Sequence, residues 1–394
     1  MKKVLALFLL IACTSLFADD VSVKPAGEGT EESPYLFDRL ENFFWLRQQT
    51  AEMEQSVPVY CKQIKDIDAS ATQQGGDYAW SDINFSQNNL FVYDGQEYTI
   101  YGLEPNEKGT LFGTGYMQLK NIRIQGAEGI KTCALAKILY SLEGKNGCFE
   151  NCHIKGLLVG TPALAEMISG SDVKIEGCIV EASIEELQGS GALINRFRVG
   201  GVCSFRKNSF KGTIEVDSPT AISGMILYIY VFLSNTEINI EDCYSIFDVT
   251  VIPESPCHFA GLLMNVQPSD TKTNFNVSIE RCYVSGTAKG FQTINNKAFI
   301  WGDAITNCTL NVRDCYYNKS INLPDDYAVG KTDEEMKQQA TFENWDFENV
   351  WDIDEGEGTP YLKSEIPEPN GTYIMFLLIL LKNWRVKQQK QTAI

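Results

Sequence analysis

The residues able to act as acids, bases or nucleophiles are few and scattered along this 394-residue chain. It has two histidines, His153 and His258, and each directly follows a cysteine. Alternation of inward and outward side chains along a strand would turn both imidazoles outward. Neither is placed with a serine or cysteine in a recognisable nucleophile motif, and the chain has no phosphate loop, dinucleotide fingerprint or H-E-x-x-H. Histidine chemistry therefore has two candidates without evident partners.

Carboxylates gather in three short clusters: Asp66 with Asp68, Asp325 with Asp326, and the acidic run 352–357. Glycosidases need two facing carboxylates at a defined separation. Asp66-Ile67-Asp68 instead alternates as a half-exposed strand does. The run from Asp352 lacks the glycine and the bidentate glutamate of a twelve-residue calcium loop. We interpret these clusters as solvated surfaces and predict no catalytic residue, no metal and no cofactor.

Cysteine marks a loose internal repeat. The recurring phrase is an alternating apolar pair, two turn residues and a cysteine, as in Val173-Lys174-Ile175-Glu176-Gly177-Cys178. Period-two alternation followed by a turn predicts short strands, and repeats of this size predict a solenoid. Full copies end at Cys178, Cys243, Cys282 and Cys315, a truncated copy ends at Cys152, and a degenerate copy has Ser209 in the cysteine position.

The fold expected from this repeat is all-β. No amphipathic run with 3.6-residue spacing occurs between residues 120 and 320, so the solenoid is predicted to be a parallel β-helix rather than a helical array. The apolar stripe Phe37, Leu40, Phe43, Phe44 and Leu46 predicts a helix that caps the N-terminal end. Thr332-Asp333-Glu334-Glu335 predicts a capping box that opens a second short helix near the other end.

One cysteine per coil at the same phase predicts a buried column made of Cys152, Cys178, Cys243, Cys282 and Cys315. Stacked parallel strands point these side chains the same way, whereas a disulfide needs particular Cβ directions. Free thiols are therefore favoured, although an exported chain would ordinarily form disulfides, and that alternative stays open. Tyr244, Tyr283 and Tyr316 each follow a column cysteine and are expected to stack on the outer face.

The N-terminus has the layout of a secretory signal peptide. Lys2 and Lys3 precede an apolar run, and the stretch ending at Ala18 is a plausible cleavage site for signal peptidase. The run is shorter than the roughly 20 residues that span a bilayer. The alternative is a bacterial lipobox, Leu10-Ile11-Ala12-Cys13, which would make Cys13 a lipidated N-terminus.

The C-terminus resembles PEP-type sorting signals (PEP-CTERM) of Gram-negative bacteria. Pro367-Glu368-Pro369 precedes nine apolar residues, 373–381, and then a basic tail that includes Lys382 and Arg385. The resemblance implies recognition and processing by an exosortase. Basic residues beyond the apolar run would hold that end on the cytoplasmic side until cleavage.

The body of the chain, residues 27–363, resembles bacterial surface proteins built around the GLUG motif. The matching segments are Gly29-Thr30 with Pro34-Tyr35, the strand pair 94–103, and the closing stretches 344–351 and 360–362. The name-giving glycine-rich segments are eroded, with Gly156-Leu157-Leu158-Val159-Gly160 the closest. The resemblance implies a right-handed parallel β-helix, an extracellular location, and an adhesion or biofilm role.

The net charge of the chain limits the classes of partner that it is expected to bind. With 33 basic and 51 acidic residues, the net charge is −18, which argues against nucleic-acid binding and disfavours anionic membranes. We expect an exported, non-enzymatic protein of the cell surface, outer membrane or extracellular matrix, whose partners are extracellular polysaccharide or other surface proteins. The alternative is a polysaccharide-binding or polysaccharide-cleaving β-helix (lyase or glycosidase), because this fold also houses such enzymes. The expected divisions are a signal peptide (1–18), an N-terminal cap with the first strands (27–120), coils (121–322), a C-terminal cap (323–363), and a linker with the sorting signal (364–394).

Overall fold

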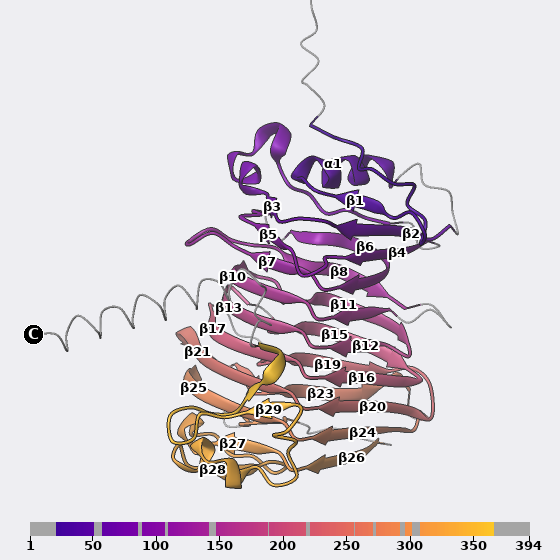
Figure 1. Ribbon diagram of the computed structural model, residues 1–394. Coiled ribbons are helices and arrows are strands. Elements are labelled where there is room, and N and C mark those ends of the chain that lie inside the picture. Colours follow the sequence, from indigo (N-terminus) through magenta and orange to yellow (C-terminus); the bar gives the residue numbers. More distant parts are fainter. Residues whose placement is uncertain are drawn as a thin grey trace, which may run out of the picture.

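The chain forms a column of parallel β coils, shown in Figure 1. The computed structural model describes residues 21–365 except 51–56, 86–88, 107–108, 142–146, 188, 218–220, 256, 271–272, 292–295 and 302–307. The predicted signal peptide with Ala18 and Cys13 lies outside the described residues, as does the sorting signal with Pro367, Glu368, Pro369, Lys382 and Arg385. Each central strand pairs in parallel with its counterpart one coil later, which is the topology of a parallel β-helix.

Two stacks of strands share the largest sheet, joined through the long strand β6 (Thr110–Lys120). The first stack continues with β8 (Ala134–Tyr140), β11 (Ala165–Ser171), β15 (Ile194–Gly200), β19 (Ile226–Val231) and β23 (Leu263–Pro268). The second stack continues with β9 (Cys148–Glu150), β12 (Lys174–Glu176), β16 (Val202–Arg206), β20 (Thr236–Glu241), β24 (Phe275–Glu280) and β26 (Cys308–Arg313). On the N-terminal side β1 (Tyr35–Phe37), β2 (Val59–Gln63) and β4 (Leu90–Asp94) extend the sheet.

A second sheet forms another face of the column. Its strands are β3 (Ile67–Asp68), β5 (Thr99–Tyr101), β7 (Arg123–Gln125), β10 (His153–Val159), β13 (Ile179–Glu185), β17 (Ser209–Val216), β21 (Tyr244–Ser255), β25 (Tyr283–Phe291), β27 (Tyr316–Asn318) and β28 (Val329–Lys331). A short third sheet holds β14 (Ser190–Gly191), β18 (Ala221–Ser223) and β22 (His258–Ala260). Alternating apolar residues such as Ile238 and Ile240 fill the interior, so each coil buries its edge against its neighbours.

The corner between the second stack and the second sheet has the same backbone conformation in coil after coil. Its residue has positive φ, between 52° and 70°, in every coil from Asn121 to Asp314. Asparagine, aspartate and glycine tolerate this region best, yet Lys207 and Arg281 also adopt it. The full corner series is Asn121, Asn151, Gly177, Lys207, Asp242, Arg281 and Asp314.

The register of the paired strands shows that the cysteine position of the degenerate repeat was predicted one residue too late. Ser209 pairs with Ile179 and Tyr244, which are outward positions, so Asn208 and not Ser209 occupies the cysteine position. Asn208 is fully buried; its Oδ1 accepts a 2.9 Å hydrogen bond from the Cys178 amide and its Nδ2 donates to the Ile175 carbonyl. An amide fits the column because it can satisfy the backbone groups that meet at the corner.

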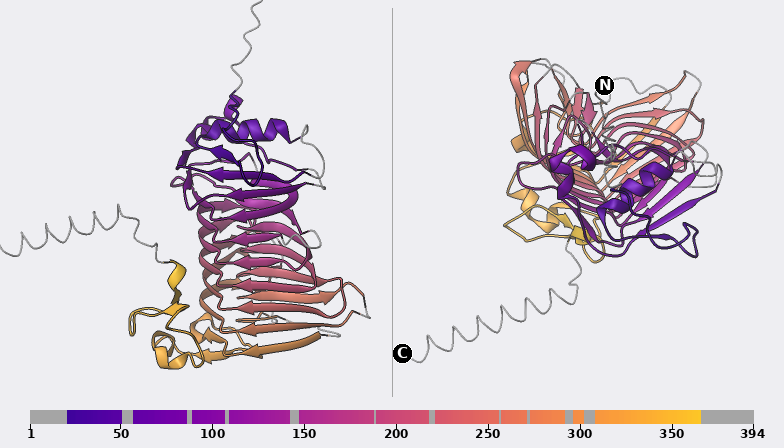
Figure 2. Two further views of the ribbon diagram at one scale, coloured as in Figure 1. Left: turned by 45° about the vertical axis from the view of Figure 1, so that its right-hand side comes forward. Right: turned by 90° about the horizontal axis from the view of Figure 1, so that it is seen from above.

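The predicted N-terminal helix is present as α1 (Leu40–Gln49), and it lies across that end of the column (Figures 1 and 2). Its buried residues include Leu40, Phe43, Phe44 and Leu46. Phe43 contacts Tyr93 of β4 with ring centroids 5.8 Å apart. This face shields the apolar edge of the first coil from water, as the stripe predicted.

The C-terminal end differs from the prediction of a second capping helix. Both capping-box bonds between Thr332 and Glu335 form, but they open only a 3-10 turn, Glu335–Lys337. The segment 332–365, which we call the strap, then continues through the antiparallel pair β29 (Trp351–Asp352) and β30 (Tyr361–Leu362). It lies along the outer side of the second sheet, not over the end of the column (Figure 2).

Candidate functional site

The strap docks on a ladder of tyrosines. Tyr244, Tyr283 and Tyr316 stand in register on β21, β25 and β27, and the first two rings stack at 5.0 Å and 8°. They point outward from the sheet, as expected from the sequence, but they are buried. The strap covers them with Met336, Phe342, Trp345, Trp351 and Leu362. This second apolar cluster holds the strap to the solenoid by burial of aromatic surface.

Hydrogen bonds fix the strap along this ladder. The hydroxyl of Tyr283 donates to the Pro360 carbonyl at 2.5 Å, and the hydroxyl of Tyr244 donates to Glu365 at 2.6 Å. Lys211 Nζ lies 2.7 Å from the same carboxylate. Burial raises the pKa of both tyrosines, so the phenols remain neutral donors. Glu365, the last described residue of the strap, is thereby anchored beside strand β17, several coils away from the C-terminal end of the column.

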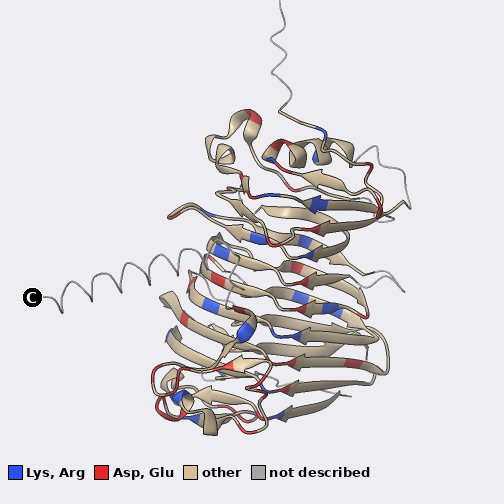
Figure 3. Ribbon diagram, in the orientation of Figure 1, with Lys and Arg blue, Asp and Glu red and all other residues tan. Residues whose placement is uncertain are grey.

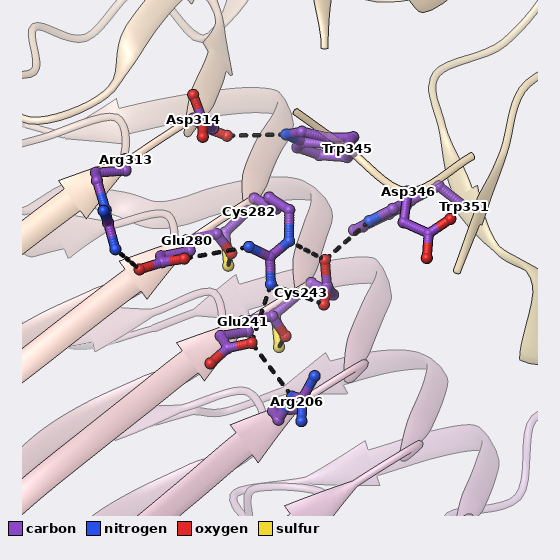
Figure 4. Close-up of polar contacts among 12 residues, drawn as sticks. Arg206, Glu241, Cys243, Glu280, Cys282, Arg313, Asp314, Trp345, Asp346 and Trp351 are labelled. Atoms are coloured by element: carbon purple, nitrogen blue, oxygen red, sulfur yellow. Dashed lines mark hydrogen bonds and ion pairs between the residues drawn. The ribbon is translucent and has the colours of Figure 1, made fainter. Parts of the chain in front are cut away.

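A charged cluster forms the other side of the docking face (Figure 4). Arg281 Nε lies 2.8 Å from Asp242, and its two terminal nitrogens reach Glu241 and Glu280 at 2.9 and 3.1 Å. The hydrogen bond to Asp242 raises the pKa of Arg281 against the opposing effect of burial. Asp242 is buried, so this pairing offsets the cost of removing its carboxylate from water.

Two strap tryptophans bind corner residues of the solenoid. Trp351 Nε1 donates to Asp242 Oδ1 at 3.2 Å, and Trp345 Nε1 donates to the Asp314 carbonyl at 2.9 Å. Asn344 Nδ2 reaches the Asp314 carboxylate at 3.2 Å. The strap thus contacts two of the positive-φ corners that sequence reasoning treated only as turn residues. The available signal was the aspartate at two later corners, Asp242 and Asp314, where the first coils have asparagine.

Alternating charges extend from this cluster over the second stack of strands. Glu241 also lies 3.4 Å from Arg206, and Glu280 pairs with Arg313. Nearer the N-terminus Lys174 bridges Glu150 and Glu176 at 2.9 and 2.8 Å. Pairs at such exposed positions contribute little individually, about 0–1 kcal/mol each. They pair opposite charges on neighbouring coils.

The predicted cysteine column lies inside the solenoid at the same corner. Cys152, Cys178, Cys243, Cys282 and Cys315 are all buried, and each Sγ lies within 3.8 Å of a backbone carbonyl. The described cysteines are free thiols. Burial raises the pKa of Cys152, Cys282 and Cys315 well above the ordinary value, which suppresses the reactive thiolate. The column fills space and donates to corner carbonyls.

The two histidines face outward but are half-buried. No hydrogen-bond partner for His153 Nε2 or His258 Nδ1 is found among the described residues. Burial lowers the pKa of His153, while Glu181 and Glu365 oppose that shift. His258 packs on Trp301 with ring centroids 5.4 Å apart. The structure therefore brings His153 near the end of the strap, and it places His258 in a separate aromatic contact.

The acidic clusters serve loops and turns. Asp66 accepts from the Thr99 amide at 2.8 Å, and Asp68 accepts from Ser70. Asp325 receives four backbone amides, and Asp326 pairs with Lys297 at 2.5 Å. These carboxylates organise local backbone, in keeping with their interpretation as surface groups.

Three surface hollows of the described structure are open to solvent, and none of the three is lined by two carboxylates. Their volumes are 350, 510 and 250 Å³. Glu104 is the acidic residue that lines the second hollow, and Asp38 is the one that lines the third. No group of three or more His, Cys, Asp or Glu side chains in the described ranges is arranged to hold a metal ion. Within the same ranges, no helix has the length and apolar character needed to cross a membrane.

Comparisons with known proteins give one structural likeness. No family model matches the chain, and no curated protein matches it. A crystal structure of a candidate immunoglobulin A1 protease from Bacteroides ovatus is similar over 87% of this chain and 96% of that one. The sequence identity is 17% and the TM-score is 0.48. This likeness is too remote to carry any statement about activity.

Proposed function

We propose that this chain is an exported, non-enzymatic, right-handed parallel β-helix protein of the cell surface or extracellular matrix of a Gram-negative-type bacterium. Signal peptidase would cleave after Ala18, and an exosortase would recognise Pro367-Glu368-Pro369. The resemblance to GLUG-motif surface proteins supports an adhesion or biofilm role. The right hand follows the strong preference of parallel β crossovers.

The observation that carries this proposal is where the strap is anchored. Glu365 is bound by Lys211 and Tyr244, two residues before the proposed sorting triplet begins. A tail leaving from this point would be attached to the side of a rigid column and not to a loose end. Its removal would leave intact every strap contact described above, so the processed body would stay folded.

The chemistry-bearing groups of the described structure support a structural role. The acidic clusters accept backbone hydrogen bonds, and the column cysteines are buried with raised pKa values. The charged cluster around Arg281 is saturated by its own carboxylates and covered by Trp351. These groups are occupied in holding coils and strap together.

Intact-mass measurement after fractionation of an exosortase-bearing host tests the proposal. We expect surface or matrix material to begin at Asp19 and to lack the residues beyond Pro369. The variant Pro367→Ala/Pro369→Ala should retain the tail, while the exposed Pro324→Ala should be processed like wild type. Surface protein that keeps its tail would contradict the sorting proposal, and a lipid on Cys13 would replace the signal-peptidase assignment.

Incubation with a panel of acidic and neutral polysaccharides addresses the alternative of a polysaccharide-cleaving enzyme. We expect no release of reducing ends or unsaturated products. Either product, lost in a variant of a single acidic or basic residue, would overturn the non-enzymatic assignment. Binding without cleavage is compatible with the proposal.

A further inference from the structure

The outer face of the first strand stack carries two columns of tyrosine and arginine. Tyr116, Tyr140, Arg198 and Tyr230 stand in one column along the solenoid axis, with Ser169 between Tyr140 and Arg198. Arg196 and Tyr228 stand beside them, two residues earlier on the same strands. We call Tyr116, Tyr140, Arg196, Arg198, Tyr228 and Tyr230 the Tyr–Arg face.

The arginines of this face are free to bind a ligand. Arg196 and Arg198 are exposed, and no ion pair among the described residues includes either of them. Arg198 lies 5.6 Å from the ring of Phe232, which leaves its planar edge available. A guanidinium can donate two parallel hydrogen bonds to a carboxylate. Two neighbouring arginines that form no ion pair with the described residues therefore suit an anionic ligand.

The tyrosines flank these cations. The ring centroids of Tyr228 and Tyr230 on β19 lie 5.7 Å apart. Those of Tyr116 on β6 and Tyr140 on β8 lie 5.5 Å apart. All four are half-buried, so each side chain is packed in part against the sheet and keeps part of its surface exposed. An aromatic ring offers an apolar surface and, in tyrosine, a hydroxyl, which matches the mixed character of a sugar ring.

Charge is distributed so that an anion can approach this face. The strap, on another side of the column, holds eleven acidic and two basic residues. In Figure 3 red gathers along the strap, while β15 carries blue and β19 is tan. Thus the Tyr–Arg face departs from the acidity of the chain as a whole.

The shape of the face selects a linear polymer. Strands stack about 4.8 Å apart and residues rise about 3.3 Å, so the face is roughly 19 Å long and its two columns are about 7 Å apart. Those dimensions enclose roughly 130 Å², whereas one partner of a standard protein interface buries about 800 Å². A narrow strip along the axis fits a chain that meets successive coils.

We infer that the Tyr–Arg face binds an acidic polysaccharide whose uronate carboxylates pair with Arg196 and Arg198 and whose sugar rings pack on the tyrosines. This inference rests on the proposed extracellular role, because it names the matrix polymer that the surface would hold there. It does not depend on tail processing or on adhesion to another protein.

Binding of the purified full-length chain to labelled polygalacturonate tests the inference, with neutral dextran and poly-L-glutamate as comparison probes. Polygalacturonate should bind and weaken with added salt, since screening acts on exposed charges. The variant Arg196→Gln/Arg198→Gln should lose about 10- to 100-fold in affinity. Lys289→Gln/Lys319→Gln, which removes two exposed cations elsewhere, should bind like wild type.

A second pair of variants tests the aromatic contribution. Tyr228→Ser/Tyr230→Ser should weaken polygalacturonate binding about 10-fold, while Tyr98→Ser/Tyr101→Ser on the second-sheet side should not. Thermal unfolding confirms that each variant is folded. Unchanged affinity in Arg196→Gln/Arg198→Gln, or equal binding of dextran, would overturn the inference. Equal binding of poly-L-glutamate would also overturn it and would indicate an acidic protein partner. Since this assay uses unprocessed protein, its failure is distinguishable from failure of export or sorting.

Discussion

The indole Nε1 of Trp351 donates a 3.2 Å hydrogen bond to Oδ1 of Asp242, which lies 109 residues earlier in the chain. The bond joins the strap to a corner of the solenoid. It adds a second donor to the buried Asp242 carboxylate, which also forms an ion pair with Arg281. The strap is therefore part of the folded body, with its own buried cluster and its own polar anchors.

Trp351→Phe should loosen the strap. The change removes a donor from a buried carboxylate and leaves a small cavity, at a cost of about 1–3 kcal/mol. Hydrogen exchange should increase in the strap more than in the strands of the column. Trp301→Phe is the matched control, since no partner for Trp301 Nε1 is found among the described residues. Equal protection of the strap in both variants would contradict the anchoring role.

Stability should fall as acid protonates His153. Burial lowers the folded-state pKa of this imidazole, so the unfolded state binds a proton more readily. The free energy of unfolding should therefore decrease as pH drops below the unfolded value of about 6.5, until the folded-state pKa is reached. Denaturant titrations at pH 8 and pH 5.5 measure this difference. His153→Gln should reduce it relative to wild type and to His258→Gln; an unchanged difference would contradict the assignment.

Asn208→Cys should be tolerated better than Asn208→Ala. Cysteine keeps a side-chain donor at the corner and fills more of the site, whereas alanine leaves the Ile175 carbonyl without the amide and creates a cavity. We expect alanine to cost about 2–4 kcal/mol and cysteine roughly half of that. Chemical denaturation measures both, with Asn276→Ala, at an exposed position of strand β24, as control. The reverse order would show that size and donor capacity do not govern this column.

The described cysteines should be protected as thiols in the native protein. Eleven are free, and all but the half-buried Cys308 are buried. Burial raises the pKa of Cys308 to about 11, so even this thiol should react slowly at pH 8. Alkylation followed by mass spectrometry should find almost no label before denaturation and all eleven labelled after it without a reductant. Labelling that requires a reductant would indicate disulfides.

Local patterns in the sequence predicted the coils because each strand has one buried face. A buried face requires apolar residues at alternate positions, and this alternation is visible within each strand. The cysteine phase identified the corner, and the apolar stripe around Phe43 identified the helix over the first coil. The one-residue error at Ser209 arose because alternation is ambiguous where a polar residue replaces cysteine. Only the pairing of Ser209 with Ile179 and Tyr244 resolves it.

The sequence by itself determined a β solenoid with a column of buried thiols, since both follow from repeated local alternation. The tertiary structure decided where the strap lies, because the contacts of Trp351, Trp345 and Glu365 join residues 109, 31 and 121 positions apart, to which no local pattern refers. It also decided the Tyr–Arg face. Tyr140 and Tyr230 belong to different coils, and only the stacking of strands brings them and Arg198 into one line.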